Sequence, residues 1–242
     1  MKQIVIGDIH GRTIWKDIIE KEKDADKIIF VGDYFDSFDI GTKKEVKNFK
    51  EILSFKKENS DKVILLFGNH DYHYLPEVYE VGEHYSRFRP QIYKQVGRRI
   101  KTGVLSGTFK MCYVYKDILI SHAGVTKTWC ENVNVDIDNL EESINSTFKE
   151  NVRRFKFYMF DTSNESTRIS DPYGDDKYQS PIWVRPFSLV SDKLEGFRQV
   201  VGHTRTKTQG SNHYEGVYFV DCLDTSNGYL VIQDEKLIHS FL

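Results

Sequence analysis

The stretch "FVGDYFDSFDIG" (Phe30–Gly41) places two carboxylates directly after an apolar run. The apolar residues end at Gly32, and Asp33 and Asp36 follow beside two aromatic side chains. Glycine at such a point lets the chain turn sharply or approach a ligand closely. Acids just beyond the end of a buried strand are typical of a sheet edge that binds a ligand.

The same form recurs on both sides of this stretch. The runs "QIVIGD" (3–8), "KIIFVGD" (27–33) and "KVILLFGNHD" (62–71) are continuously apolar, which predicts strands covered on both faces. Residues 14–19 and 46–53 between them have helical periodicity. The alternation predicts a layered α/β fold in which central β-sheets, at least partly parallel, are flanked by helices, with the motifs at the carboxyl ends of strands.

The 242 residues are expected to form a single domain, 1–242, because the length suits one full core. Short strands are predicted on both sides of Lys116–Asp117 and again in the C-terminal third. Two segments, at about 72–107 and 154–187, lack clear periodicity. Long irregular stretches in a compact domain often serve as lids or substrate loops, and we expect that role for both.

Composition excludes several classes of protein. The formal net charge is −2 with 29% charged residues, so neither a nucleic acid partner nor an anionic membrane is expected. The three cysteines, Cys112, Cys130 and Cys222, are too far apart for a thiolate zinc site or a disulfide framework. The N-terminal apolar run is too short for a signal peptide, and no run is long enough to span a membrane. A cytoplasmic protein is therefore expected.

Motifs that carry chemistry close five of the predicted strands: "GDIHG", "GDYFD", "GNHD", "SHAG" and "VGHT". They contribute Asp8, His10, Asp33, Asp36, Asn69, His70, His122 and His203. Carboxylate, imidazole and amide groups without a thiolate are the ligands of borderline-hard divalent ions such as Mn²⁺, Fe²⁺ or Zn²⁺. Two such ions about 3.5–4 Å apart can clamp the attacking and leaving oxygens of a phosphoryl displacement.

This series of motifs resembles the calcineurin-like metallophosphoesterase superfamily, and most closely its phosphoprotein phosphatase branch, which includes bacterial and phage serine/threonine phosphatases. The resemblance runs from Asp8 to His203. It implies two divalent metal ions, expected to be Mn²⁺ with Fe or Zn as alternatives. Asp8 and His10 would bind one ion and Asp33 would bridge both. The second ion would be held by Asn69, His122 and His203.

The resemblance also implies a pair of residues that transfers a proton. A hydroxide that bridges the two metal ions would attack phosphorus in line. His70 would lie near the leaving-group oxygen and donate a proton to it. Asp36 would hydrogen-bond the other ring nitrogen of His70 and so fix its tautomer and direction.

One part of the family pattern is missing. The phosphoprotein phosphatase branch usually reads GDxxDRG, whose arginine binds phosphate, but Ser37 and Phe38 stand here instead. Because a guanidinium is the natural clamp for phosphate, a substitute is expected. Arg185 in "SPIWVRP" matches a W-x-R segment of related phosphatases, and Arg12 is a second candidate. Arg205 is expected to be a solvated or helix-facing side chain.

Several polar residues are expected to have structural roles. Asp71 should support the GNHD loop rather than bind metal. Asp221 and Asp224 should form a turn near the last strand pair. A surface or packing role is expected for His73.

These features predict a metal-dependent phosphomonoesterase, most simply a serine/threonine protein phosphatase that acts on a phosphorylated protein or a small phosphoester. One alternative keeps the chemistry and changes the substrate: a dinucleoside polyphosphate hydrolase or a nucleotide or polynucleotide phosphatase. Another is an inactive metal-binding scaffold, which should have lost ligands or the proton donor. The oligomeric state stays open.

Overall fold

The computed structural model describes residues 1–157, 173–206, 213–214 and 216–242. Within these ranges the backbone forms two β-sheets. The strands are β1 (Lys2–Ile6), β2 (Lys27–Phe30), β3 (Val63–Leu66), β4 (Phe109–Lys110), β5 (Cys112–Tyr115), β6 (Ile118–Ser121), β7 (Arg198–Val201), β8 (His213–Tyr214), β9 (Val217–Phe219), β10 (Gly228–Gln233) and β11 (Lys236–Phe241).

The larger sheet has the strand order β11-β10-β1-β2-β3-β4, and the smaller has the order β5-β6-β7-β9-β8. Strands β1 to β4 run parallel, as do β6, β7 and β9. Antiparallel pairs close the edges at β10–β11, β5–β6 and β8–β9. Each sheet therefore presents the carboxyl ends of several parallel strands at one edge, as the sequence predicted.

Helices connect most of these strands. In the described residues they are α1 (Trp15–Lys21), α2 (Thr42–Glu58), α3 (Asn69–Tyr72), α4 (Pro76–Tyr79), α5 (Pro90–Leu105), α6 (Lys127–Val133), α7 (Leu140–Glu150), α8 (Pro186–Ser191), α9 (Leu223–Ser226) and the 3-10 helix η1 (Val152–Phe155). None of the helices in these ranges is long and apolar enough to cross a membrane.

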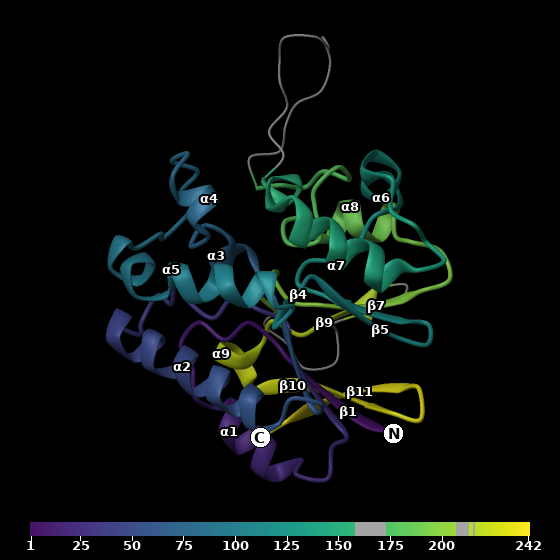
Figure 1. Ribbon diagram of the computed structural model, residues 1–242. Coiled ribbons are helices and arrows are strands. Elements are labelled where there is room, and N and C mark those ends of the chain that lie inside the picture. The colour runs from purple at the N-terminus through teal and green to yellow at the C-terminus, as the bar shows by residue number, and fades with distance from the viewer. Residues whose placement is uncertain (158–172, 207–212, 215) are drawn as a thin grey trace.

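The two sheets pack face to face, and helices cover their outer faces (Figure 1). Val5 of β1 and Ile29 of β2 pack with Val200 of β7 in the core between the sheets. Their neighbours Ile4 and Ile28 point to the opposite face, into the core shared with the helices. Because alternate residues of one strand enter two different cores, the strand is continuously apolar, as predicted.

The prediction of irregular structure at about 72–107 is wrong for its second half, where α5 forms. Ile92, Val96 and Ile100 recur every four residues and are fully buried, which is a helical pattern. Pro90 occupies the first turn, where its missing N–H costs nothing. In the second predicted segment, 158–172 lies outside the described residues, and α8 begins at its end.

Candidate active site

The carboxyl ends of the central strands meet at one cleft where the two sheets adjoin. The cleft has a volume of about 220 Å³. Among the residues that line it are Asp8, His10, Asp33, Asn69, His70 and His203. Two more, Asp36 and His122, are fully buried directly behind this lining. The structure thus brings together all eight residues predicted to bind metal or transfer a proton.

Two motif glycines make room for the carboxylates of this cleft. A β-carbon at Gly68 would collide with the carboxylate of Asp33, and one at Gly202 would collide with that of Asp8. A larger residue at either position would push a carboxylate away from the cleft. The glycines of "FGNHD" and "VGHT" are therefore required by close approach.

Four of the predicted site residues adopt left-handed backbone conformations, with φ values of 40°, 53°, 65° and 62°. They are His10, Asp33, Asp36 and His203. Such conformations are unfavourable for residues other than glycine and persist only where the surrounding structure enforces them. Their concentration here indicates that the fold is organised around the positions of these side chains.

Backbone carbonyl groups fix the tautomers of His10 and His122. Each donates its Nδ1 proton to a carbonyl oxygen, of Phe35 at 2.5 Å and of Val31 at 2.9 Å, respectively. Burial lowers the pKa of both rings to about 3, so both are neutral at pH 7. The unprotonated Nε2 atoms lie 3.8 and 3.5 Å from Oδ2 of Asp33. One carboxylate oxygen therefore lies between two imidazole lone pairs.

A second group of acceptors surrounds the side-chain oxygen of Asn69. His203 donates its Nε2 proton to the carbonyl oxygen of Trp183 at 3.2 Å, which leaves the lone pair on Nδ1. That Nδ1 and Nε2 of His122 each lie 2.9 Å from Oδ1 of Asn69. Burial keeps the pKa of His203 well below its ordinary value. With the amide in this orientation, three acceptors face one another without a proton, an arrangement that a cation would stabilise.

The donor set fits divalent cations. The ligand atoms of Asp8, His10 and Asp33 lie within 4.8 Å of one another. Burial, followed by repulsion from neighbouring carboxylates, raises the pKa of Asp8 and Asp33 well above the ordinary range. Positive charge between these groups would relieve the repulsion. Metal-binding histidines usually donate the N–H of their second ring nitrogen to a carbonyl or carboxylate. His10, His122 and His203 all do so here, each to a backbone carbonyl.

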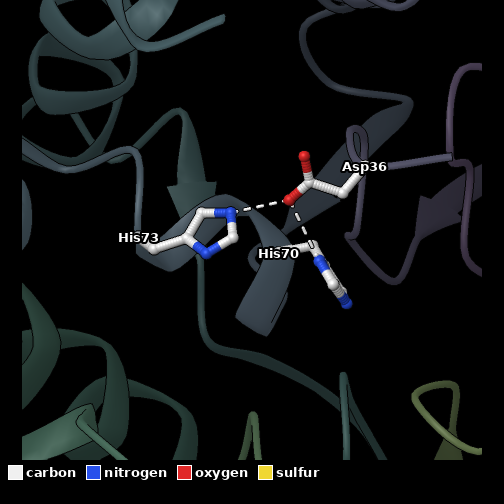
Figure 2. Close-up of side chains that lie close together, drawn as sticks. All are labelled: Asp36, His70 and His73. Atoms are coloured by element: carbon white, nitrogen blue, oxygen red, sulfur yellow. Dashed lines mark hydrogen bonds and ion pairs between the residues drawn. The ribbon is translucent and has the colours of Figure 1, made fainter. Parts of the chain in front are cut away.

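Asp36 is the centre of a hydrogen-bonded cluster (Figure 2). Its Oδ2 lies 3.0 Å from Nδ1 of His70 and 2.6 Å from Nε2 of His73. Its Oδ1 accepts a hydrogen bond of 2.5 Å from the hydroxyl of Tyr74. Burial opposes ionisation of Asp36, but the two histidine hydrogen bonds outweigh it and lower the pKa to about 2. The carboxylate is therefore ionised, and it makes the predicted hydrogen bond to the ring of His70.

His73 refines one expectation from the sequence. It is fully buried and packs against Tyr74 and Phe88, which confirms packing and excludes a surface role, and it also bonds to Asp36, which was not expected. Sequence reasoning also missed the contact of Tyr74 with the same carboxylate. The ligand atoms of Asp36, His70 and His73 lie within 4.8 Å of one another, but Asp36 already accepts three hydrogen bonds. We therefore interpret this group as a hydrogen-bonded cluster.

Asp71 supports the loop, as predicted. Its carboxylate accepts backbone hydrogen bonds from Asp33 and Tyr34, both at 2.8 Å, and from Gly68 at 3.0 Å. These bonds join the loop after β2 to the loop after β3. The carboxylate of Asp71 thus fixes the backbone next to two of the predicted metal ligands, Asp33 and Asn69.

Both predicted phosphate-binding arginines line the cleft. The guanidinium of Arg185 donates to the carbonyl oxygen of His203 at 3.0 Å. That of Arg12 lies 3.3 Å from Oγ of Ser37 and pairs with Asp39 at 3.0 Å. Arg12 therefore lies beside the position at which the family pattern has its arginine.

Four more charged residues belong to the cleft. Arg205 pairs with Asp224 at 2.7 Å while its side chain stays 53% exposed, which agrees only in part with a solvated role. Asp221 lines the cleft as well, and burial raises its pKa to about 7. A turn is thus an incomplete description of Asp221 and Asp224. Arg87, between α4 and α5, was not predicted, because no local motif surrounds it.

The fold and the donor set define a metal-dependent phosphoesterase. The family model described as calcineurin-like phosphoesterase matches residues 1–204, a span that contains every predicted metal ligand. The chain belongs to the calcineurin-like phosphoesterase family. No curated protein matches the sequence.

Solved structures of phosphatases share the fold. A cold-active protein-tyrosine phosphatase of a psychrophilic Shewanella species matches with a TM-score of 0.63 and 17% identity, over 99% of this chain and 77% of that chain. A Saccharomyces cerevisiae protein serine/threonine phosphatase with similarity to human phosphatase PP5 matches with a TM-score of 0.56 and 12% identity, over 99% of this chain and 79% of that chain. At these identities the similarity establishes the fold.

Proposed function

We propose that this protein is a phosphomonoesterase that uses two divalent cations, expected to be Mn²⁺, and acts on phosphoserine or phosphothreonine in proteins. One observation carries the proposal: the cation-binding group around Asp33 and the His70–Asp36 pair belong to one cleft. A metal site would supply charge stabilisation and the attacking water, and a proton donor would assist departure of an unactivated leaving group, so their presence in one cleft favours ester hydrolysis.

The residues that would hold the cations fall into two sets that share Asp33. The first set is Asp8, His10 and Asp33, and the second is Asp33, Asn69, His122 and His203. When bound, the cations would place positive charge at the phosphoryl oxygens and lower the pKa of the attacking water.

His70 would transfer the proton to the leaving group. Its Nδ1 is bonded to the ionised Asp36 at 3.0 Å, so Nε2 is the ring nitrogen left to carry the transferred proton to a leaving oxygen in the cleft. The carboxylate of Asp36 fixes the tautomer and the direction of the ring that donates. His73 and Tyr74 bind the same carboxylate and thereby limit its movement.

The size of the cleft favours a phosphorylated side chain over a dinucleotide. Pockets that enclose drug-sized ligands usually have about 300–1,000 Å³. The described residues form a cleft of about 220 Å³, which suits a phosphate and a short side-chain stem. A dinucleoside polyphosphate would have to extend well beyond these walls, so we keep that substrate as the alternative.

The experiment compares substrates on the Mn²⁺-loaded protein. Release of inorganic phosphate should have the highest kcat/KM for phosphoserine and phosphothreonine peptides. The panel also contains a phosphotyrosine peptide, diadenosine tetraphosphate and an aryl phosphate, and the His70→Ala variant controls for contaminating activity. Faster turnover of diadenosine tetraphosphate would establish the alternative. A protein that binds Mn²⁺ but hydrolyses none of the panel would be a scaffold.

A further inference from the structure

We propose that Arg87 binds the substrate phosphate and supplies the guanidinium that the motif at Ser37 lacks. The inference rests on the proposed function, because it concerns the same cleft. It names a residue outside every strand-end motif, on the segment between α4 and α5.

Arg87 is held at the cleft by two contacts with the motif that lost its arginine. One guanidinium nitrogen donates to the backbone carbonyl of Asp36 at 2.7 Å. The guanidinium carbon lies 3.3 Å from the ring centroid of Phe38. Phe38 thus takes the position of the family's glycine and carries a cation on its face. The motif has no arginine after Asp36, but the tertiary structure places the guanidinium of Arg87 against the residues on either side of Ser37.

The charge of Arg87 is available to a ligand. Arg12 and Arg205 also line the cleft, but both form ion pairs with carboxylates. Among the described residues, Arg87 forms no ion pair and makes a single hydrogen bond. A guanidinium has five N–H donors, so four remain for an anion. A guanidinium stacked on a ring is also less hydrated, which favours binding of phosphate.

Arg89 fixes the segment that carries Arg87. Its guanidinium donates to the backbone carbonyl of Ser37 and pairs with the fully buried Glu45 at 2.9 Å. Glu45 in turn accepts the backbone N–H of Ser37 at 2.6 Å. Arg87 therefore does not have to be ordered when the ligand arrives, which reduces the entropic cost of binding.

Arg87 and Arg185 both line the cleft and are held by different loops. Arg185 bonds to the carbonyl of His203, whereas Arg87 bonds to the carbonyl of Asp36, whose side chain holds His70. A phosphate between them could accept hydrogen bonds from one arginine near the metal ligands and from another near the proton donor. Such a pair would orient the ester so that its leaving oxygen faces His70.

The first test measures binding of inorganic phosphate to the Mn²⁺-loaded protein by calorimetry. We expect Arg87→Gln to weaken phosphate binding about 10- to 100-fold, as for the loss of a hydrogen bond between charged groups. Arg99→Gln is the matched control, because Arg99 lies on α5 with its side chain exposed, away from the cleft. Binding by Arg87→Gln within twofold of the wild type would overturn the proposal, as would a wild type that binds no phosphate.

A second set of variants separates ligand binding from support of the loop. Phe38→Ala leaves the bond to Asp36 in place and should weaken phosphate binding by a few-fold; unchanged binding would overturn the role of the ring. In Arg87→Ala, millimolar guanidinium should restore part of the affinity, which a merely structural residue would not allow. Absence of rescue in a folded, Mn²⁺-loaded variant contradicts direct binding.

These measurements are independent of turnover. If phosphate binding depends on Arg87 but no phosphopeptide is hydrolysed, the proposed function fails and the anion site stands. If phosphopeptides are hydrolysed and phosphate binding ignores Arg87, the proposed function stands and the anion site fails.

Discussion

The floor and the wall of the cleft are built in different ways. The floor, made of Asp8, His10, Asp33, Asn69, His122 and His203, comes from residues that follow strands directly, and backbone carbonyls fix its imidazoles. The wall, made of Arg12, Arg87, Arg185 and Arg205, comes from loops far apart in the chain, and those arginines bond to carbonyls, carboxylates and an aromatic ring. Local motifs thus specify the reaction, and long-range assembly shapes what is bound.

The two regions also differ in electrostatics. The floor concentrates buried carboxylates whose pKa values burial raises, together with histidines whose pKa values burial lowers. Without a cation the buried carboxylates are unstable in their charged form, whereas the histidines are neutral and keep lone pairs that a cation can bind. The arginines of the wall are partly exposed and do not depend on a bound metal ion. Substitutions in the floor should therefore abolish activity, whereas substitutions in the wall should reduce it only in part.

Asp33→Asn would give the largest effect. Asparagine tolerates the left-handed backbone at this position, but it removes the charge from the oxygen between His10 and His122. We expect loss of bound Mn²⁺ and of detectable hydrolysis, measured by metal analysis and phosphate release. Asp138→Asn, at an exposed acid before α7, should resemble the wild type. Substantial turnover by Asp33→Asn would refute its position at the centre of the floor.

His70→Ala tests the proton donor, which lies in the cleft but belongs to neither the floor nor the wall. The variant should keep its metal, because the acceptor cluster does not use this side chain, but turnover should fall about 10²–10⁴-fold. The loss should be greatest for esters with poor leaving groups, since those need protonation most. Rate measurements over a series of phosphate esters of increasing leaving-group pKa check whether the loss in rate increases with that pKa. Equal losses across the series would argue against proton donation.

Metal affinity should increase with pH. Burial and neighbouring carboxylates raise the pKa of Asp8 and Asp33, so in the metal-free protein these acids retain protons that free carboxylic acids have lost. A cation must displace them, and affinity should change by up to about tenfold per pH unit for each proton released. Calorimetry in buffers of different ionisation enthalpy counts the protons. Binding without proton release would contradict the raised pKa values.

Tyr74→Phe should have the smallest effect on turnover. It deprives the buried Oδ1 of Asp36 of its donor at 2.5 Å and the backbone N–H of Arg89 of its acceptor at 3.1 Å. Such unpaired groups cost about 1–3 kcal/mol, so the free energy of unfolding in denaturant should fall by that amount. Turnover should decrease less than in His70→Ala. Tyr115→Phe on β5 serves as the matched control, and an equal loss there would remove the special role of Tyr74.

The sequence predicted the layered fold and the assembly of eight site residues, because glycine, acid and histidine at strand ends leave a local pattern. It did not reveal α5, where Tyr93, Gly97 and two arginines stand between the apolar residues of the repeat Ile92, Val96 and Ile100. His73 was assigned to the surface or to packing because its partner, Asp36, lies 37 residues away in the chain.

What the sequence determined by itself is the chemistry: which donor atoms exist and at which strand ends they lie. Within each sheet, parallel strands bring those ends to one edge, so each half of the floor can be inferred from spacing along the chain; packing of the two sheets joins the halves. Only the tertiary structure decided which arginine side chains face the floor. The position of Arg87 depends on where a loop returns, and on its contacts with Asp36 and Phe38, neither of which leaves a pattern in the sequence.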